Sequence, residues 1–103
     1  MHTFPLQIIS PEGRIFSADA EGVTAWGVAG SFGVLANHAP MIAALLPGAV
    51  TVRTPEGDTF YAGGEGVLEV RPDKQVILLI DYAEPFDTAV EAREKAKERL
   101  DLL

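Results

Sequence analysis

Short apolar segments separated by glycine and proline make up the first 84 residues of the chain. Pro11-Glu12-Gly13 and Pro55-Glu56-Gly57 are turn sequences, because proline presets φ and glycine accepts a positive φ. The segments between turns have the length and the β-branched content of strands rather than helices. Strands at a spacing of about 8–12 residues predict an all-β sandwich or barrel. A parallel α/β sheet is excluded, because there is no room for crossover helices.

The turn signals delimit a set of predicted strands. They are Phe4–Ile9, Arg14–Ser17, Gly22–Val28, Gly33–Leu35, Met41–Leu46, Ala49–Thr54, Thr59–Ala62, Gly64–Arg71 and Gln75–Asp81. Val23 and Ala25 alternate with Thr24 and Trp26, which predicts an inward and an outward face. Trp26 is then either an exposed interface anchor or a cap on the core. The strand Gln75–Asp81 is almost entirely apolar, which predicts a central strand covered on both faces.

After Pro85 the pattern changes to that of one short helix, so we expect a β domain over residues 1–85 and a helical segment over residues 86–103. Asp87-Thr88 is the expected N-cap. Glu91 and Lys95 have the spacing and order of a stabilising ion pair. The apolar stripe is narrow, so we expect the helix to pack lightly or to lean on a partner; the stripe consists of Ala89, Ala92, Ala96 and Leu100.

Composition narrows the classes of function. The chain has 103 residues, of which 48% are hydrophobic, enough for one core, and it has no cysteine, which excludes disulfides and thiolate metal sites. Residues 1–86 carry four basic and ten acidic side chains. An acidic body repels phosphates, so we expect no nucleic-acid partner. No signal-peptide pattern and no apolar run long enough to span a bilayer is visible, so we expect no direct insertion into the membrane.

Residues suited to catalysis are sparse. The two histidines, His2 and His38, are far apart and lack a neighbouring nucleophile or further ligands, so we interpret His38 as structural or as part of an interface. The glycine clusters at residues 27–30 and 63–66 neither match a phosphate-binding loop nor open a helix. They are typical of bulges and of close backbone approach. We therefore expect no catalytic residue, no cofactor and no metal.

Four ordered blocks carry a resemblance to a known family. Residues 30–40 read GSFGVLANHAP and are followed by an apolar strand and Pro47-Gly48. Gly63-Gly64 precedes Val67-Leu68-Glu69-Val70, residues 8–12 read IISPE, and Glu91-Ala92-Arg93 opens the charged segment. In this order and spacing, the blocks resemble the epsilon subunit of F-type ATP synthases over almost the whole chain.

The resemblance implies a two-layer β-sandwich of about ten strands and a non-catalytic place in a rotor. The expected partners are the gamma subunit and the c-ring of the membrane sector, with the catalytic head contacted only indirectly. Such a subunit couples proton or sodium flow to ATP synthesis. It is expected to lie peripherally at the cytoplasmic face of a bacterial inner membrane, or at the equivalent face of an organelle membrane. The implied partner interface consists of Ala29, Gly30, Ser31, Phe32, Gly33, His38, Ala39, Pro40 and Met41.

The chain departs from the family pattern at several positions. Ala36-Asn37 replaces a Pro-Gly pair, and asparagine tolerates the left-handed φ that this turn needs. Ala29 and Ser31 stand where many members have acids, so a contact with the c-ring depends on shape, hydrogen bonds and Phe32, or on other acids such as Glu21. From the resemblance we expect no second C-terminal helix, and Val90 and Glu94 replace residues of an ATP-binding motif. We therefore expect a short form without detectable ATP binding or self-inhibition by an extended hairpin.

Two other functions remain open at this point. The acidic body and Trp26 would also suit a stand-alone β-sandwich that binds a ligand or a protein. An enzyme that uses His38 is the third possibility, for which the sequence shows no supporting partner residue.

Overall fold

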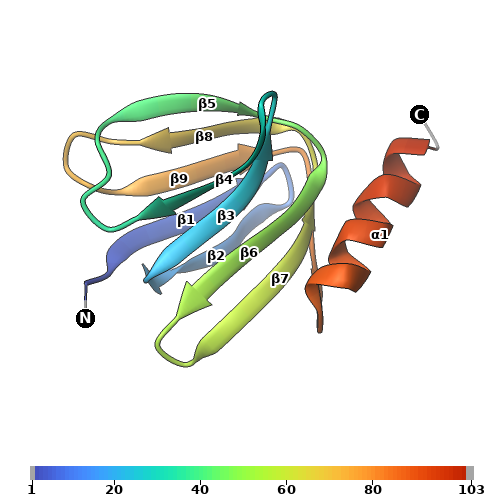
Figure 1. Ribbon diagram of the computed structural model, residues 1–103, viewed down its shortest axis with the longest axis horizontal. Coiled ribbons are helices and arrows are strands. Elements are labelled where there is room, and N and C mark those ends of the chain that lie inside the picture. Colours follow the sequence, from blue (N-terminus) through green and yellow to red (C-terminus); the bar gives the residue numbers. More distant parts are fainter. Residues whose placement is uncertain (1, 102–103) are drawn as a thin grey trace.

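The computed structural model describes residues 2–101 and contains a ten-stranded sheet and one helix (Figure 1). The elements are β1 (Phe4–Ser10), β2 (Gly13–Ala20), β3 (Gly22–Gly27), β4 (Gly30–Leu35), β5 (Met41–Leu45), β6 (Gly48–Thr54), β7 (Gly57–Gly63), β8 (Gly66–Val70), β9 (Val76–Ile80), β10 (Ala83–Phe86) and α1 (Ala89–Asp101).

The strands form one continuous sheet that folds over on itself into two layers (Figure 1). Its order is β10-β7-β6-β3-β5-β8-β9-β1-β2, and β4 pairs with β3 beside this path. All neighbours are antiparallel except β1 and β9, which are parallel. The predicted two-layer β-sandwich with one C-terminal helix is thereby confirmed. The division into domains at residue 85 stays a prediction.

Strand β10 was not predicted from the sequence. Glu84 and Pro85 are unfavourable in the middle of a sheet, so the sequence pattern did not indicate a strand there. The structure places β10 at an edge, where it pairs only with β7 and where proline is tolerated.

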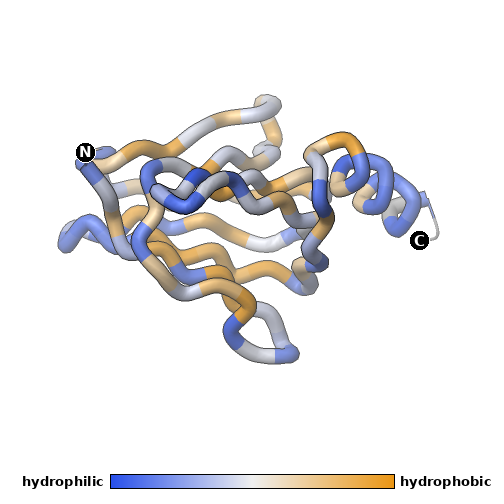
Figure 2. Tube along the Cα trace, turned by 90° about the horizontal axis from the view of Figure 1, so that it is seen from below, coloured by the Kyte–Doolittle hydropathy of each residue, from blue (hydrophilic) through white to orange (hydrophobic). Residues whose placement is uncertain are grey.

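The core lies between the layers, and the residues around it alternate inward and outward along the strands. Figure 2 shows this as hydrophobic stretches along the strands and a mostly hydrophilic helix. The buried cluster consists of Phe4, Leu6, Ile8, Ala20, Val23, Ala25, Val34, Leu45, Val50, Val52, Tyr61, Leu68, Val70, Val76, Leu78 and Ile80. The predicted alternation in β3 is confirmed, because Val23 and Ala25 are buried whereas Thr24 and Trp26 are exposed.

The prediction that the last long strand is covered on both faces is wrong. In β9, Leu78 is fully buried but its neighbour Leu79 is 48% exposed. The strand is central in the sheet order, between β8 and β1. A sandwich nevertheless buries only the inner face of each layer unless another element covers the outer face. The helix packs elsewhere, against β6, β7 and β10.

The helix begins where the sequence predicts. The Thr88 hydroxyl accepts a hydrogen bond from the Glu91 N–H at 3.2 Å and donates one to the Glu91 carboxylate at 3.1 Å. Thr88 is therefore the N-cap. Among the described residues the predicted Glu91–Lys95 ion pair is not formed. The Lys95 Nζ atom lies 3.7 Å from a Glu98 carboxylate oxygen instead, while the Glu91 carboxylate accepts a hydrogen bond from the Thr88 hydroxyl.

Two alanines anchor the helix on the sheet. Ala92 and Ala96 are buried, as predicted for the apolar stripe, whereas the side chain of Leu100 lies outside the described part of the chain. Near the other end, the Arg99 guanidinium lies 3.7 Å from the ring centroid of Tyr82. Such a cation–π contact stabilises by about 0.5–1 kcal/mol when it is exposed. The helix thus packs lightly, through small side chains and one polar contact.

Candidate functional site

An open groove of about 530 Å³ lies between β4 and β5 and reaches the β3–β4 turn. Most of the predicted interface residues line it. These are Ala29, Gly30, Ser31, Phe32, Gly33, His38 and Met41. Ala39 and Pro40 are exposed in the same β4–β5 connection but do not line the groove. The fold therefore brings the turn at residues 28–29 and the connection around His38 to one surface. That they bind a partner stays a prediction.

Local turn chemistry shapes both ends of this groove. The β3–β4 hairpin closes through Gly27 and Gly30, and Gly30 has φ 116°, which side-chain-bearing residues rarely adopt. In the β4–β5 connection, Asn37 has φ 66°, and the His38 N–H donates to the Leu35 carbonyl at 3.3 Å. The expectation that asparagine supports the left-handed turn in place of glycine is confirmed.

The groove offers hydrogen bonds and apolar surface rather than charge. His38 is the one ionisable side chain among its lining residues. Its Nδ1 lies 2.7 Å from the Ala39 carbonyl oxygen, which fixes Nδ1 as the donor and leaves Nε2 for another partner. The Phe32 ring is partly buried against the core and forms the apolar floor near the turn. Such a surface can bind a partner by shape, backbone contacts and hydrogen bonds.

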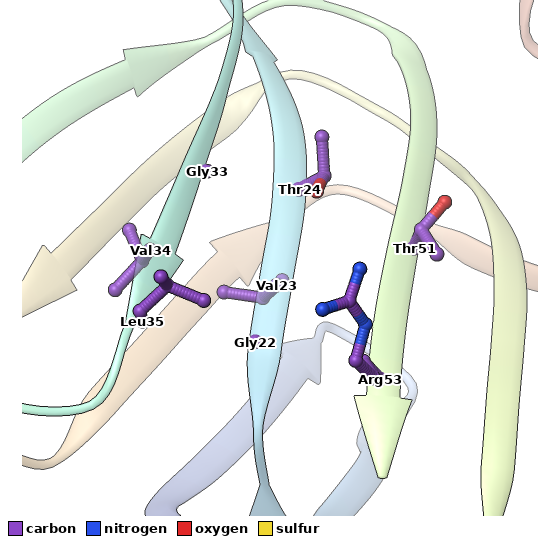
Figure 3. A pocket seen from close by; sticks show the side chains of 8 residues that line it. All are labelled: Gly22, Val23, Thr24, Gly33, Val34, Leu35, Thr51 and Arg53. Atoms are coloured by element: carbon purple, nitrogen blue, oxygen red, sulfur yellow. The ribbon is translucent and has the colours of Figure 1, made fainter.

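A second hollow, between β4, β3 and β6, is much smaller. It measures about 60 Å³, and Figure 3 shows its side chains, with Arg53 reaching from β6 toward β3. On this measure one water needs about 10–15 Å³, so the space suits a few waters, whereas ligand pockets measure about 300–1,000 Å³.

Three further residues singled out in the sequence can now be placed. Trp26 is 40% exposed on the outward face of β3, and its indole covers Gly48, so it lies over the sheet rather than in the core. Glu21 does not line the groove, and one of its carboxylate oxygens is buried without a hydrogen-bond partner among the described residues. In the second glycine cluster, a Cβ at Gly66 would overlap the Leu79 carbonyl. Close backbone approach, as predicted, therefore accounts for this glycine.

Sequence reasoning missed an apolar row on the outer face of the second layer, which β5, β8, β9, β1 and β2 form, whereas β3, β6, β7 and β10 form the first layer. The cross-strand register aligns Ala44 with Val67, Val67 with Leu79, and Leu79 with Ile9. Val67 is 37% exposed and Leu79 48% exposed. A contiguous exposed apolar patch is typical of a protein interface. The strand pattern alone could not reveal it, because in β9 both faces are apolar.

The described residues hold no group of three or more side chains suited to binding a metal ion. Within the same part of the chain, no helix is long and apolar enough to cross a bilayer. The geometry defines a class: a β-sandwich with an attached helix, an uncharged groove along one strand edge and an apolar outer face.

Comparison with known proteins identifies the family. The model of the ATP synthase delta/epsilon chain β-sandwich domain matches residues 3–86. The chain is 42% identical to the ATP synthase epsilon chain of Moorella thermoacetica and 38% identical to that of Anoxybacillus flavithermus. Each match covers 97% of this chain and 78% of the relative. The chain belongs to the ATP synthase epsilon chain family, as the resemblance in the sequence indicated.

Solved structures show the same fold. A chain of the Euglena gracilis mitochondrial ATP synthase, solved as the OSCP/F1/c-ring part, superposes with a TM-score of 0.77 at 23% identity. The match covers 97% of this chain and 64% of that chain, so this chain spans less than two thirds of its length. A chain of the central stalk and c-ring of the Tetrahymena thermophila enzyme gives a TM-score of 0.68 at 14% identity and covers 96% of this chain and 91% of that one. At these identities the likeness shows the fold alone.

Proposed function

We propose that this chain is a central-stalk rotor subunit of an F-type ATP synthase that joins the gamma subunit to the c-ring. In this role it couples proton or sodium flow to ATP synthesis and catalyses no reaction itself. The observation that carries the proposal is the single groove that collects the turn at residues 28–29 and the His38 connection in a chain of the epsilon family. Contact with the catalytic head is then only indirect.

Two unpartnered surfaces support a subunit held by more than one neighbour. The groove offers hydrogen bonds, including the Nε2 atom of His38, and apolar side chains that range from alanines to the exposed Val28 and Ile42. The row through Val67 and Leu79 offers apolar area on the outer face of the second layer. Because Ala29 and Ser31 bring no charge to the tip of the groove, its contacts depend on shape and hydrogen bonding.

The same proposal gives the place of the protein in the cell. Through its partners it would sit peripherally at the cytoplasmic face of a bacterial inner membrane, or at the equivalent face of an organelle membrane. It would carry no ATP site, because Val90 and Glu94 replace the residues of the ATP-binding pattern. Isothermal titration calorimetry with ATP should show no binding tighter than millimolar.

Co-purification tests the proposal directly. The chain should form a stable complex with the tagged gamma subunit of the same organism, and size-exclusion chromatography should show the two eluting together. A chain that stays monomeric in the presence of folded cognate gamma would contradict the proposed function.

A further inference from the structure

The small hollow between β4, β3 and β6 forms where two glycines leave the outer face of the sheet bare. The register of β3 with β4 places Gly22 opposite Leu35 and Thr24 opposite Gly33, so each of these cross-strand pairs has only one side chain. All four residues line the hollow, whose volume is about 60 Å³ (Figure 3). A tetrahedral oxyanion consists of four oxygen atoms around one centre, so it takes the room of a few waters, which is what this space holds.

Two hydroxyl groups stand beside each other at the hollow. Thr24 of β3 is directly opposite Thr51 of β6, and both face outward, because Val23 and Val52 beside them are buried. Residues directly opposite on one face of an antiparallel pair have Cβ atoms only about 4.5–5.5 Å apart. Within residues 2–101, neither hydroxyl takes part in a side-chain hydrogen bond. Both are therefore available to donate to a bound group.

A positive charge joins the two hydroxyls. Arg53 lies two residues after Thr51 on β6, and its guanidinium reaches toward β3 into the hollow (Figure 3). Its cross-strand neighbour on β7 is Asp58, yet among the described residues Arg53 forms no ion pair. No carboxylate lines the hollow. The guanidinium N–H donors are thus directed away from the adjacent acid, and their planar fork matches two oxygens of a phosphate or sulfate group.

We propose that this hollow binds one small tetrahedral oxyanion of the phosphate type, held by the Arg53 guanidinium and the hydroxyls of Thr24 and Thr51. The guanidinium supplies the charge, and the two hydroxyls and the bare glycine backbone set the size of the anion. A nucleotide is not the ligand, because its sugar and base would lie outside a space of about 60 Å³.

The site is separate from the surfaces described above. It shares only Gly33 with the groove between β4 and β5. It also lies apart from Val90 and Glu94 on α1, where the ATP-binding pattern is lost. The inference therefore goes beyond the proposed function and does not depend on it, and it is tested on the isolated chain without the gamma subunit.

Titration with sodium phosphate, followed by proton–nitrogen correlation NMR at constant pH and ionic strength, tests the site directly. The amide signals of Thr24 and Thr51 and the Nε–H signal of Arg53 should shift together and reach saturation. Shifts that rise linearly without saturation, or that appear equally at the other basic side chains, would overturn the proposal.

Removing the charge provides the second test. Arg53→Gln should weaken phosphate binding by at least about tenfold, because hydrogen bonds between ionised partners are the strong ones. Arg14→Gln is the matched control. It removes the same charge from another exposed arginine, on β2, that forms no ion pair among the described residues, and it should leave the Kd unchanged. Equal losses in the two variants would reduce the effect to net charge and contradict a site at Arg53.

The hydroxyls are tested by variants of similar shape. Thr24→Val removes the hydroxyl and should weaken phosphate binding by about threefold to tenfold, the effect of one hydrogen bond. Thr24→Ser keeps the hydroxyl and is the control. Thermal melts establish that both variants are folded, and Thr51→Val with Thr51→Ser repeats the comparison if either is not. Equal affinities for a folded valine variant and its serine control would contradict a site built on the hydroxyls.

Sulfate and ATP separate the possible sources of the oxyanion. Sulfate has the same tetrahedral shape and should displace phosphate from the same residues. ATP should bind no more tightly than phosphate, because the hollow offers nothing to its sugar and base. ATP that shifts the signals of Thr24, Thr51 and Arg53 and binds at least about tenfold more tightly than phosphate would assign the hollow to a nucleotide and overturn the proposal.

Discussion

The outer faces of the two layers differ in what covers them. On the first layer, α1 packs over β6 and β7, and its Ala92 and Ala96 are buried there. On the second layer, no described element covers the outer face, and Val67 and Leu79 are partly exposed. The helix contacts the covered face through small alanine side chains, whereas the open face exposes the larger apolar side chains of Val67 and Leu79. Apolar area that the chain does not bury itself is available for a partner.

The largest expected effect comes from the inner face of the second layer, and the outer face of the same layer provides the control. Leu78→Ala should lower the free energy of unfolding by about 2–5 kcal/mol, because Leu78 is fully buried between the layers. The adjacent Leu79→Ala is the matched control and should cost about 1 kcal/mol or less, since nearly half of that side chain is already in water. Urea unfolding measures both. Equal losses would mean that the outer face is covered in the isolated protein.

A large side chain placed in the groove tests whether the groove binds a partner. Ser31→Arg should weaken binding of the gamma subunit by at least about tenfold, or about 1.4 kcal/mol, and change the stability of the free protein by less than about 0.5 kcal/mol. Ser31 is exposed and lines the groove. Ser17→Arg, at another exposed serine on an edge strand, should leave binding unchanged. Surface plasmon resonance gives the affinities. A loss of binding in both variants would reflect charge rather than the groove.

The N-cap of α1 is expected to contribute less to the free energy of unfolding than Leu78 does. Thr88→Ala removes the cap on the Glu91 N–H and should lower the free energy of unfolding by about 1 kcal/mol. Asp87→Ala, one residue earlier, should have little effect, because the hydrogen bond comes from Thr88. Circular dichroism at the helical wavelength and thermal melting measure the change. If Asp87→Ala lowered the stability more than Thr88→Ala, Asp87 rather than Thr88 would be the N-cap.

The smallest effect concerns pH at the far end of the helix. Burial raises the pKa of Tyr82 above its usual value of 10.0, and the Arg99 guanidinium partly opposes this shift. A raised pKa in the folded state means that the stabilisation is complete below pH 10 and is lost as the pH rises through the folded pKa. The free energy of unfolding should therefore decline above about pH 10, and Tyr82→Phe should make the decline shallower. An identical slope in wild type and variant would contradict a buried tyrosine there.

Much of the local structure follows from the sequence. Proline and glycine mark the turns, the alternation in β3 separates Val23 from Thr24, and Thr88 starts the helix. Even the left-handed turn at Asn37 could be predicted, because φ preferences and side-chain caps act between residues that are neighbours along the chain. Seven of the twelve residues that line the groove were also named as interface residues, through the family resemblance, and their role in binding stays a prediction.

What the sequence by itself determined is thus most of the strands, the turns, the helix cap and the all-β class. Only the tertiary structure decided that Leu79 is exposed while Leu78 is buried, that β10 joins an edge, and that β4 and β5 leave a groove between them. The physical reason is that local preferences act over a few residues. Burial of a strand face and pairing of a strand edge depend instead on which distant segments pack beside them.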